Sequence, residues 1–180
     1  GGEVRDAFFL DCGKTVESAA PVTEIPGLEH LEGLAVHILA DGAVRKPQTV
    51  RNGAITLDRP ARVIQVGLPY ESRLETTFVE AGAQAGTAQG AKKRVVKAQL
   101  RVLESAGGEI GSPAAGRWQT IFARDTRDKM DSPARLVSGD LANTPWPGGW
   151  ETGGSVGIRQ QLPLPLCVLA IVMVVETTDL

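Results

Sequence analysis

The sequence predicts an all-β protein, with antiparallel strands in a sandwich-like or barrel-like arrangement and two small lobes. Three observations favour this fold class. Apolar and polar residues alternate with period two in many short segments, whereas segments of helical period are nearly absent. The 21 glycines and 11 prolines among 180 residues divide the chain into short elements. Aromatic residues make up only 4% of the chain, so aliphatic side chains must build the core.

The first lobe is expected over residues 1–80. Its first strand is predicted at 7–10, and one possible partner for this strand is the C-terminal strand. A second strand is predicted at 34–39, where Leu34, Val36 and Ile38 share one face.

Two dipeptides predict tight hairpin turns in this lobe. They are the Asp-Gly pair at 41–42 and the Asn-Gly pair at 52–53. Both residue pairs tolerate the positive φ that two-residue hairpin turns require. Strands are therefore expected on either side of these turns, and further strands at 54–57 and 61–68.

Residues 80–91 are small and polar without apolar periodicity, so a loop or linker is expected between the lobes. The second lobe is then residues 92–180. Its first element, 92–105, is compatible with a helix, but the alternation of Val96, Ala98, Leu100 and Val102 with polar residues favours a strand. The following "SAGGEIG" resembles a hairpin turn. Short strands are also expected at 118–124, 134–140 and 155–162.

The apolar run 166–175 is predicted to be a strand buried on both faces, because its β-branched residues occupy both parities. It is far shorter than the roughly 20 residues of a membrane-spanning helix, so no membrane span is expected. The net charge of −2 gives no basic footprint for specific nucleic-acid binding. The N-terminus lacks the pattern of a signal peptide.

The two histidines and two cysteines are the first residues to weigh for chemistry. His30 and His37 lie seven residues apart with no third nitrogen or sulfur ligand nearby, which is not a metal-binding spacing. Either could serve as the base of a hydrolase, but no serine stands in a nucleophile motif. Cys12 and Cys167 lack zinc-site spacing; two buried free thiols are favoured over a disulfide between them. We therefore predict no enzyme activity, no cofactor and no metal site.

Trp146 and Trp150 lie in the segment "NTPWPGGWETGG". Exposed loop tryptophans can bind sugars or protein partners, so these two residues are the candidate binding or interface residues. The alternative is that they fold back and cover the end of a sandwich.

Several segments in order carry a resemblance to a known family. The first half contains "FFLDCG", "GLEHLEGLAVHILADGAV" and "QTVRNGAITLDRPARVIQVGLPYESRLET". The second half contains "AKKRVVKAQLRVLESAGGEIG", "LVSGD" and "QLPLPLCVLAIVMVVE". Together they resemble the C-terminal portion of the tail nozzle, or tubular and stabilisation, proteins of tailed phages and prophages.

The resemblance implies a non-enzymatic structural subunit of a virion tail, made in the host cytoplasm. It also implies assembly into a ring, expected to be hexameric, through which DNA leaves. It implies other tail subunits and further copies of the chain as partners, and only transient, non-specific contact with DNA in a channel. Two rival functions stand beside it. One is a β-sandwich module that binds a glycan or host-surface receptor through Trp146 and Trp150, and the other is a hydrolase that uses His30 or His37.

Overall fold

A computed structural model describes residues 8–80, 90–122, 133, 135–141 and 146–178 of the protein. Within these ranges the chain is nearly all β, with antiparallel strand pairs, one short 3-10 helix and no α-helix, which confirms the predicted fold class. The elements in chain order are β1 (Asp11–Pro26), η2 (Glu29–Leu31), β2 (Ala35–Ala40), β3 (Ala43–Thr49), β4 (Ala54–Leu68), β5 (Ser72–Glu75), β6 (Lys93–Ser105), β7 (Glu109–Ser112), β8 (Arg117–Thr120), β9 (Val137–Leu141), β10 (Trp150–Glu151), β11 (Gly157–Gln160) and β12 (Cys167–Thr177).

The chain forms two compact units, each made from more than one segment. Unit 1 comprises Gly1–Glu71, Arg124–Arg135 and Gln161–Pro165, and unit 2 comprises Ser72–Ala123, Leu136–Gln160 and Leu166–Leu180. Strand β5 belongs to unit 2 because it pairs with β11. Most of the expected linker, residues 81–89, lies outside the described residues.

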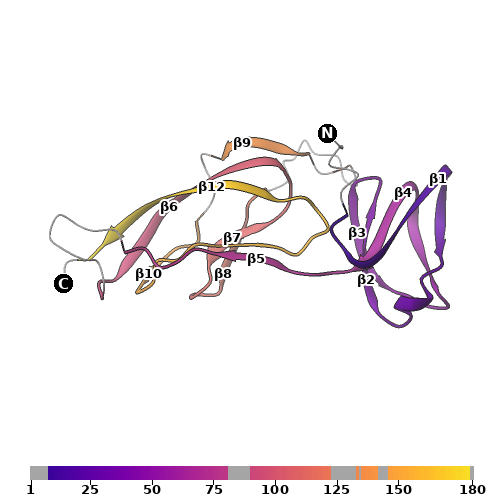
Figure 1. The fold of residues 1–180 in the computed structure, drawn as a ribbon, viewed down its shortest axis with the longest axis horizontal. Helices are drawn as coiled ribbons and strands as arrows, with labels where there is room; N and C mark the ends of the chain where they lie inside the picture. The colour runs from indigo at the N-terminus through magenta and orange to yellow at the C-terminus, as the bar shows by residue number, and fades with distance from the viewer. Residues whose placement is uncertain (1–7, 81–89, 123–132, 134, 142–145, 179–180) are drawn as a thin grey trace. The chain divides into compact units, whose positions relative to one another are not determined.

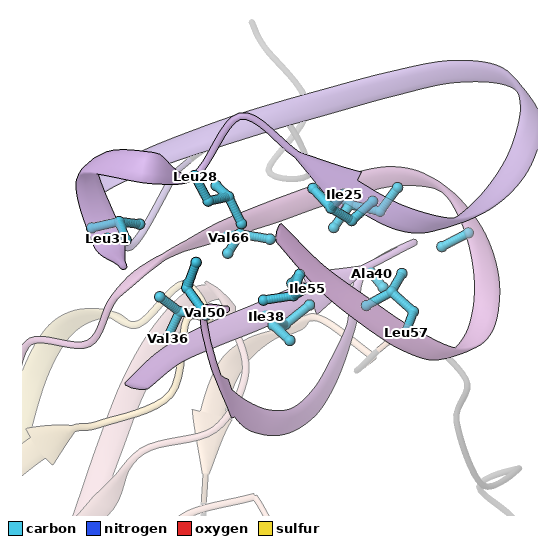
Figure 2. Close-up of a cluster of buried hydrophobic side chains, with 12 residues drawn as sticks. Ile25, Leu28, Leu31, Val36, Ile38, Ala40, Val50, Ile55, Leu57 and Val66 are labelled. Carbon is cyan, nitrogen blue, oxygen red and sulfur yellow. The ribbon is translucent and has the colours of Figure 1, made fainter. Parts of the chain in front are cut away.

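Unit 1 is built on one sheet with the strand order β1-β4-β2-β3. Its core gathers aliphatic side chains from both halves of the long strand β4, among them Ile55 and Val66 (Figure 2). The expected strands at 54–57 and 61–68 are thus one strand. An irregular pairing with β1 between them leaves Asp58, Arg59 and Pro60 exposed, and Pro60 is tolerated there because edge and bulge positions need no ladder donor.

Both predicted hairpin turns are confirmed. Asp41 and Gly42 have φ values of 48° and 77° and join β2 to β3. Asn52 and Gly53 have φ values of 54° and 66° and join β3 to β4. Positive φ at both central residues is the geometry that matches the twist of paired strands.

The predicted first strand at 7–10 is wrong in position and in its suggested partner. Among its described residues, 8–10 are not in a strand, and β1 begins at Asp11. This strand of 16 residues pairs with β4 and not with the C-terminal strand. Most of its side chains are exposed, so it lacks the apolar alternation that marks a strand with one buried face.

Unit 2 contains two four-stranded sheets (Figure 1). One has the order β10-β6-β12, with β9 also paired to β6, and the other has the order β5-β11-β7-β8. A single core joins them: Leu100 and Val102 of β6 pack in the same cluster as Ile110 of β7 and Ile158 of β11. This unit therefore has the expected sandwich character.

The strand favoured at 92–105 is confirmed as β6, but one residue of its predicted face is displaced. Ala98, Leu100 and Val102 are buried as expected, whereas Val96 is exposed and Val95 is buried in its place. The pairing of β6 with β12 shifts register at this point and leaves Val96 without a partner residue. Such a β-bulge moves all later residues to the opposite face.

The segment "SAGGEIG" is not a hairpin turn. Strand β6 pairs with β9, β10 and β12, whereas β7 pairs with β8 and β11. Gly107 and Gly108, with φ values of 68° and 82°, carry the chain from one sheet of unit 2 to the other. A glycine pair predicts a change of direction, and the strand that follows can pair elsewhere.

Candidate functional site

The candidate site is an interaction surface on β12, the edge strand of its sheet. Strand β12 pairs with β6 along its whole length, and its other side pairs with no strand among the described residues (Figure 1). Four of its side chains point inward and pack against the core of unit 2. They are Val168, Ile171, Met173 and Val175. The inward face therefore fixes the strand to the unit and defines which residues point out.

The outward face of β12 is also apolar, and it is exposed. Leu169, Val172 and Val174 have exposed fractions of 56%, 57% and 54%. The prediction that this strand is buried on both faces is therefore wrong. Apolar residues of both parities predict two covered faces, but no described element of unit 2 lies on the outer one, which remains open to a partner.

Within the part of the chain that the structure describes, the apolar part of this edge lacks the features that normally block pairing with another chain. From Cys167 to Val175 the strand contains no charged residue and no proline. Natural edge strands are commonly blunted by lysine, by proline or by a covering segment, because their free N–H and C=O groups can otherwise template a further strand. The apolar part of this edge, residues 167–175, has no such protection among the described residues and is a candidate for β-strand addition.

A basic row borders the apolar row on the same outer face. In β6, Arg94, Lys97 and Arg101 pair with Glu176, Val174 and Ala170 of β12, so each pair shares a face.

Two exposed apolar side chains of β6, Val96 and Leu103, extend the apolar row on this side.

Arg101 is held in place by an exposed ion pair with Asp140 of β9. Its Nε and one terminal nitrogen donate to the two carboxylate oxygens at 2.7 and 3.0 Å. These hydrogen bonds lower the pKa of Asp140 and raise the pKa of Arg101. The pair orients the guanidinium along the sheet, and its contribution to stability is small because both groups are solvated.

The two histidines belong to different elements of unit 1, His30 to η2 and His37 to β2. The His30 Nε2–H donates to the Cys12 carbonyl oxygen at 2.9 Å, which ties η2 to β1. His37 lies in β2 opposite Gly67, half-buried, and burial lowers its pKa. The described residues contain no group of three or more His, Cys, Asp or Glu side chains placed to hold a metal ion.

The two candidate tryptophans have different environments. Trp146 packs against the core of unit 2, and its indole N–H is buried without a hydrogen-bond partner among the described residues. Trp150 lies in β10 with an exposed fraction of 48%. The pair therefore does not present two exposed rings, and Trp150 alone is available to a ligand.

Sequence reasoning missed the environment of the third tryptophan. Trp118 of β8 has the Arg159 guanidinium at 4.4 Å and the Arg73 guanidinium at 5.6 Å from its ring centroid. The Arg159 Nε donates to a Glu109 oxygen at 2.6 Å. The ring lies over Gly157, where a Cβ would approach it to 2.8 Å. Cross-strand glycines leave room for such a ring, but the pairing that places them together is not visible in the sequence.

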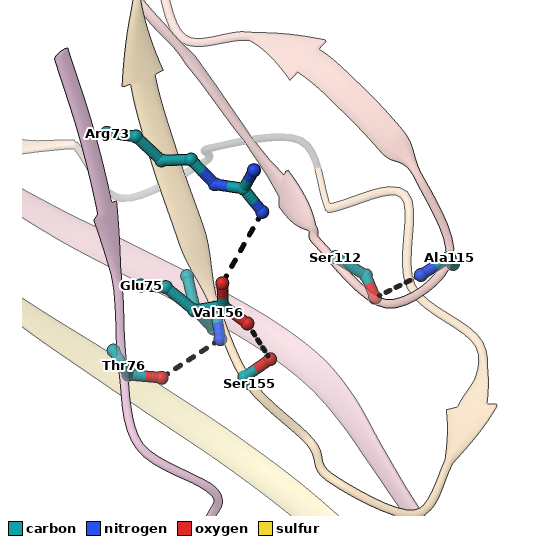
Figure 3. Close-up of polar contacts among 7 residues, drawn as sticks. All are labelled: Arg73, Glu75, Thr76, Ser112, Ala115, Ser155 and Val156. Carbon is teal, nitrogen blue, oxygen red and sulfur yellow. Dashed lines mark hydrogen bonds and ion pairs between the residues drawn. The ribbon is translucent and has the colours of Figure 1, made fainter.

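Polar contacts beside this cluster bind neighbouring strands of unit 2 (Figure 3). Arg73 and Ser155 both donate to the Glu75 carboxylate, at 3.4 and 3.2 Å. The Val156 N–H donates to the Thr76 hydroxyl at 3.0 Å. These bonds continue the β5–β11 pairing beyond the end of β5.

Cys12 and Cys167 are free thiols, and both are exposed. The expectation that they are free agrees with the structure, and the expectation that they are buried is wrong. Cys12 lies where β1 shifts register against β4, and Cys167 belongs to the outward face of β12. No helix in the described ranges combines the length and the apolar character needed to cross a bilayer.

No protein-family model matches this chain, and no curated protein matches it significantly.

Proposed function

We propose that this protein is a non-enzymatic structural component of a phage or prophage tail, a nozzle or tube-ring subunit that takes part in tail assembly and DNA passage. Its partners would be other tail subunits and further copies of itself, and any contact with DNA in the channel would be transient and non-specific. It would act in the virion tail after assembly in the host cytoplasm. The proposal draws on the ordered segments that resemble tail nozzle proteins.

The observation that carries the proposal is the outer surface of β12. A strand with Leu169, Val172 and Val174 more than half exposed is costly in water, and subunits of large assemblies commonly cover such surfaces with neighbours. The His30 ring donates to the Cys12 carbonyl oxygen, and His37 lies in a different element, so the two histidines do not favour a catalytic alternative. An exposed apolar edge is expected in a subunit of an assembly, because a neighbouring subunit can cover it.

The proposal is tested by locating the chain in particles made by its natural source. Gold-labelled antibodies raised against the recombinant chain should bind the tails of purified particles, and mass spectrometry should detect the chain in them. Antibodies against the capsid serve as the control for labelling. Intact tailed particles that lack the chain in both measurements would disprove the proposal.

A second experiment connects this role to β12. Replacing Val172 and Val174 with lysine should reduce incorporation of the chain into particles when it competes with the wild type. The matched control is Val63→Lys, because Val63 is also an exposed valine in a strand, with an exposed fraction of 40%. Equal incorporation of the double variant and the control would show that the outer surface of β12 has no role in assembly.

A glycan-binding role is the alternative function, and it now rests on Trp150 alone. If it is correct, Trp150→Ala should abolish a glycan signal that the wild type gives on an array. We expect no signal from either protein. A wild-type signal that Trp150→Ala removes would favour the binding module.

A further inference from the structure

The free side of β12 has the properties of a strand that pairs with a copy of itself. Its pairing with β6 is irregular at two places, between Val168 and Ala170 and between Val174 and Val175. The segment between them, 170–174, is regular and has Val172 at its centre. A regular stretch between two irregularities is where a further strand can form an undistorted ladder.

Self-pairing in the antiparallel direction matches this segment residue by residue. With a two-fold axis at Val172, Ala170 lies opposite Val174 and Ile171 lies opposite Met173. Ile171 and Met173 both point to the core, and Ala170, Val172 and Val174 all point outward. Directly opposed residues share a face in an antiparallel pair, so the inward and outward faces of the two copies coincide.

Charge within the paired segment does not oppose this arrangement. The paired segment contains no charged residue, so no like charges oppose each other across the junction. Glu176, the single acidic residue of β12, lies outside this segment and beside Arg94 of its own copy's β6.

The size of the contact limits its strength. Strand β12 has 11 residues, whereas a standard stable interface uses about 20 to 30 residues on each side. A pair held by this strand should therefore dissociate in the micromolar range or more weakly. The association should be visible as a concentration-dependent equilibrium.

We propose that two copies of the free chain associate through antiparallel pairing of their β12 edges about a two-fold axis at Val172, so that the two sheets become continuous. Isologous pairing uses the same edge on both copies and closes on itself. The pair would shield the apolar edge in solution. The proposal concerns the isolated chain and does not depend on the assignment to a phage tail.

Cysteine cross-linking tests the register. In a background with Cys12→Ser and Cys167→Ser, the variant Val172→Cys should form a disulfide-linked dimer under mild oxidation. Directly opposed Cα atoms lie about 4.5–5.5 Å apart, within the range of a disulfide. The matched control is Val174→Cys, which is equally exposed but whose two copies would lie about 13 Å apart along the strands. It should cross-link several-fold more slowly.

Light scattering over a concentration series tests the association without a cross-link. The wild type should rise from the mass of one chain toward that of two, and Val172→Lys should raise the dissociation constant by at least about 10-fold, because two ammonium groups would meet at the axis. The control Val63→Lys should leave it unchanged, and circular dichroism should confirm that all variants are folded. A strict monomer, or equal cross-linking at positions 172 and 174, would overturn the proposal. A chain that is strictly monomeric in solution but is still detected in purified tails would overturn this proposal while leaving the proposed function intact.

Discussion

Strands β1 and β12 occupy the same position in their sheets and have opposite surface chemistry. Each is a long edge strand held by one antiparallel neighbour, β4 or β6. Strand β1 carries Lys14, Glu17 and Pro21 along its length, residues that discourage pairing with another chain. From Cys167 to Val175, β12 carries none. The edge formed by β1 has the polar composition of a surface that stays in solvent. The edge formed by β12 has the apolar composition of an interior strand, but no described strand pairs with its free side.

The largest expected effect is on stability, and it compares how well the cores beneath β1 and β12 are packed. Ile64 of β4 and Leu100 of β6 are both fully buried, and each pairs with its edge strand. Ile64→Ala and Leu100→Ala should each lower the free energy of unfolding by about 2–5 kcal/mol, measured by denaturant titration. If Leu100→Ala costs much less, the exposure of β12 reflects a loosely packed unit, and the comparison of the two edges loses its basis.

The next effect concerns the turn that starts β4, the neighbour of β1. Glu32 accepts hydrogen bonds from the Asn52 and Gly53 N–H groups at 3.0 and 2.7 Å. Glu32→Ala should destabilise the chain by about 1.5–3 kcal/mol, because two backbone donors lose a charged acceptor. Glu24→Ala, an exposed position on β1, serves as the control and should change stability by less than about 0.5 kcal/mol. Equal effects of the two substitutions would show that this anchor is dispensable.

Exchanging the surface chemistry of the edges should change solubility more than stability. Val172→Lys with Val174→Lys should raise the solubility limit several-fold while altering the free energy of unfolding by less than about 0.5 kcal/mol. The reverse change in β1, Glu17→Val with Pro21→Val, should lower solubility. Precipitation assays and denaturant titrations measure the two quantities. An unchanged solubility limit in both variants would mean that edge chemistry does not separate the two strands.

The smallest expected effect is a pH dependence in unit 1. Burial lowers the pKa of His37, so the unfolded chain, with a histidine pKa of about 6.5, binds more protons than the folded chain at mildly acidic pH. The full stability should be present above the unfolded pKa and should fall as the pH drops below it toward the folded pKa. Melting temperatures across about pH 5 to 8 should show this decline. The variant His37→Gln should show a smaller decline, and an identical profile would exclude His37 as its source.

The sequence predicts the strands that alternate and the turns that need glycine, because both signals are local. The Asp41-Gly42 turn, the Asn52-Gly53 turn and most of β6 follow directly from these patterns. Strand β1 could not be placed in this way, since its extended form depends on a ladder with β4 and most of its side chains stay in solvent.

The candidate surface was only half predictable. The apolar run of β12 identifies a strand, but residues of both parities look the same whether a face is covered by the chain itself or left for another molecule. The positions of Trp146 and Trp118 likewise depend on packing between strands that are distant in the sequence. Local patterns therefore show that a strand is apolar, and only the tertiary structure shows which side is vacant.

The bulge at Val96 has a consequence for how the chain tolerates insertions and deletions. The residues of β6 on either side of Val96 follow two different alternation patterns, and this one extra residue connects them. Deleting Val96 would leave Val95 inward and Lys97 outward, in regular alternation. Deleting Gln99 instead would move the side chains on one side of the deletion to the opposite face of the sheet. Between Val95 and Val102, length variation should therefore concentrate at Val96, where losing one residue changes the least.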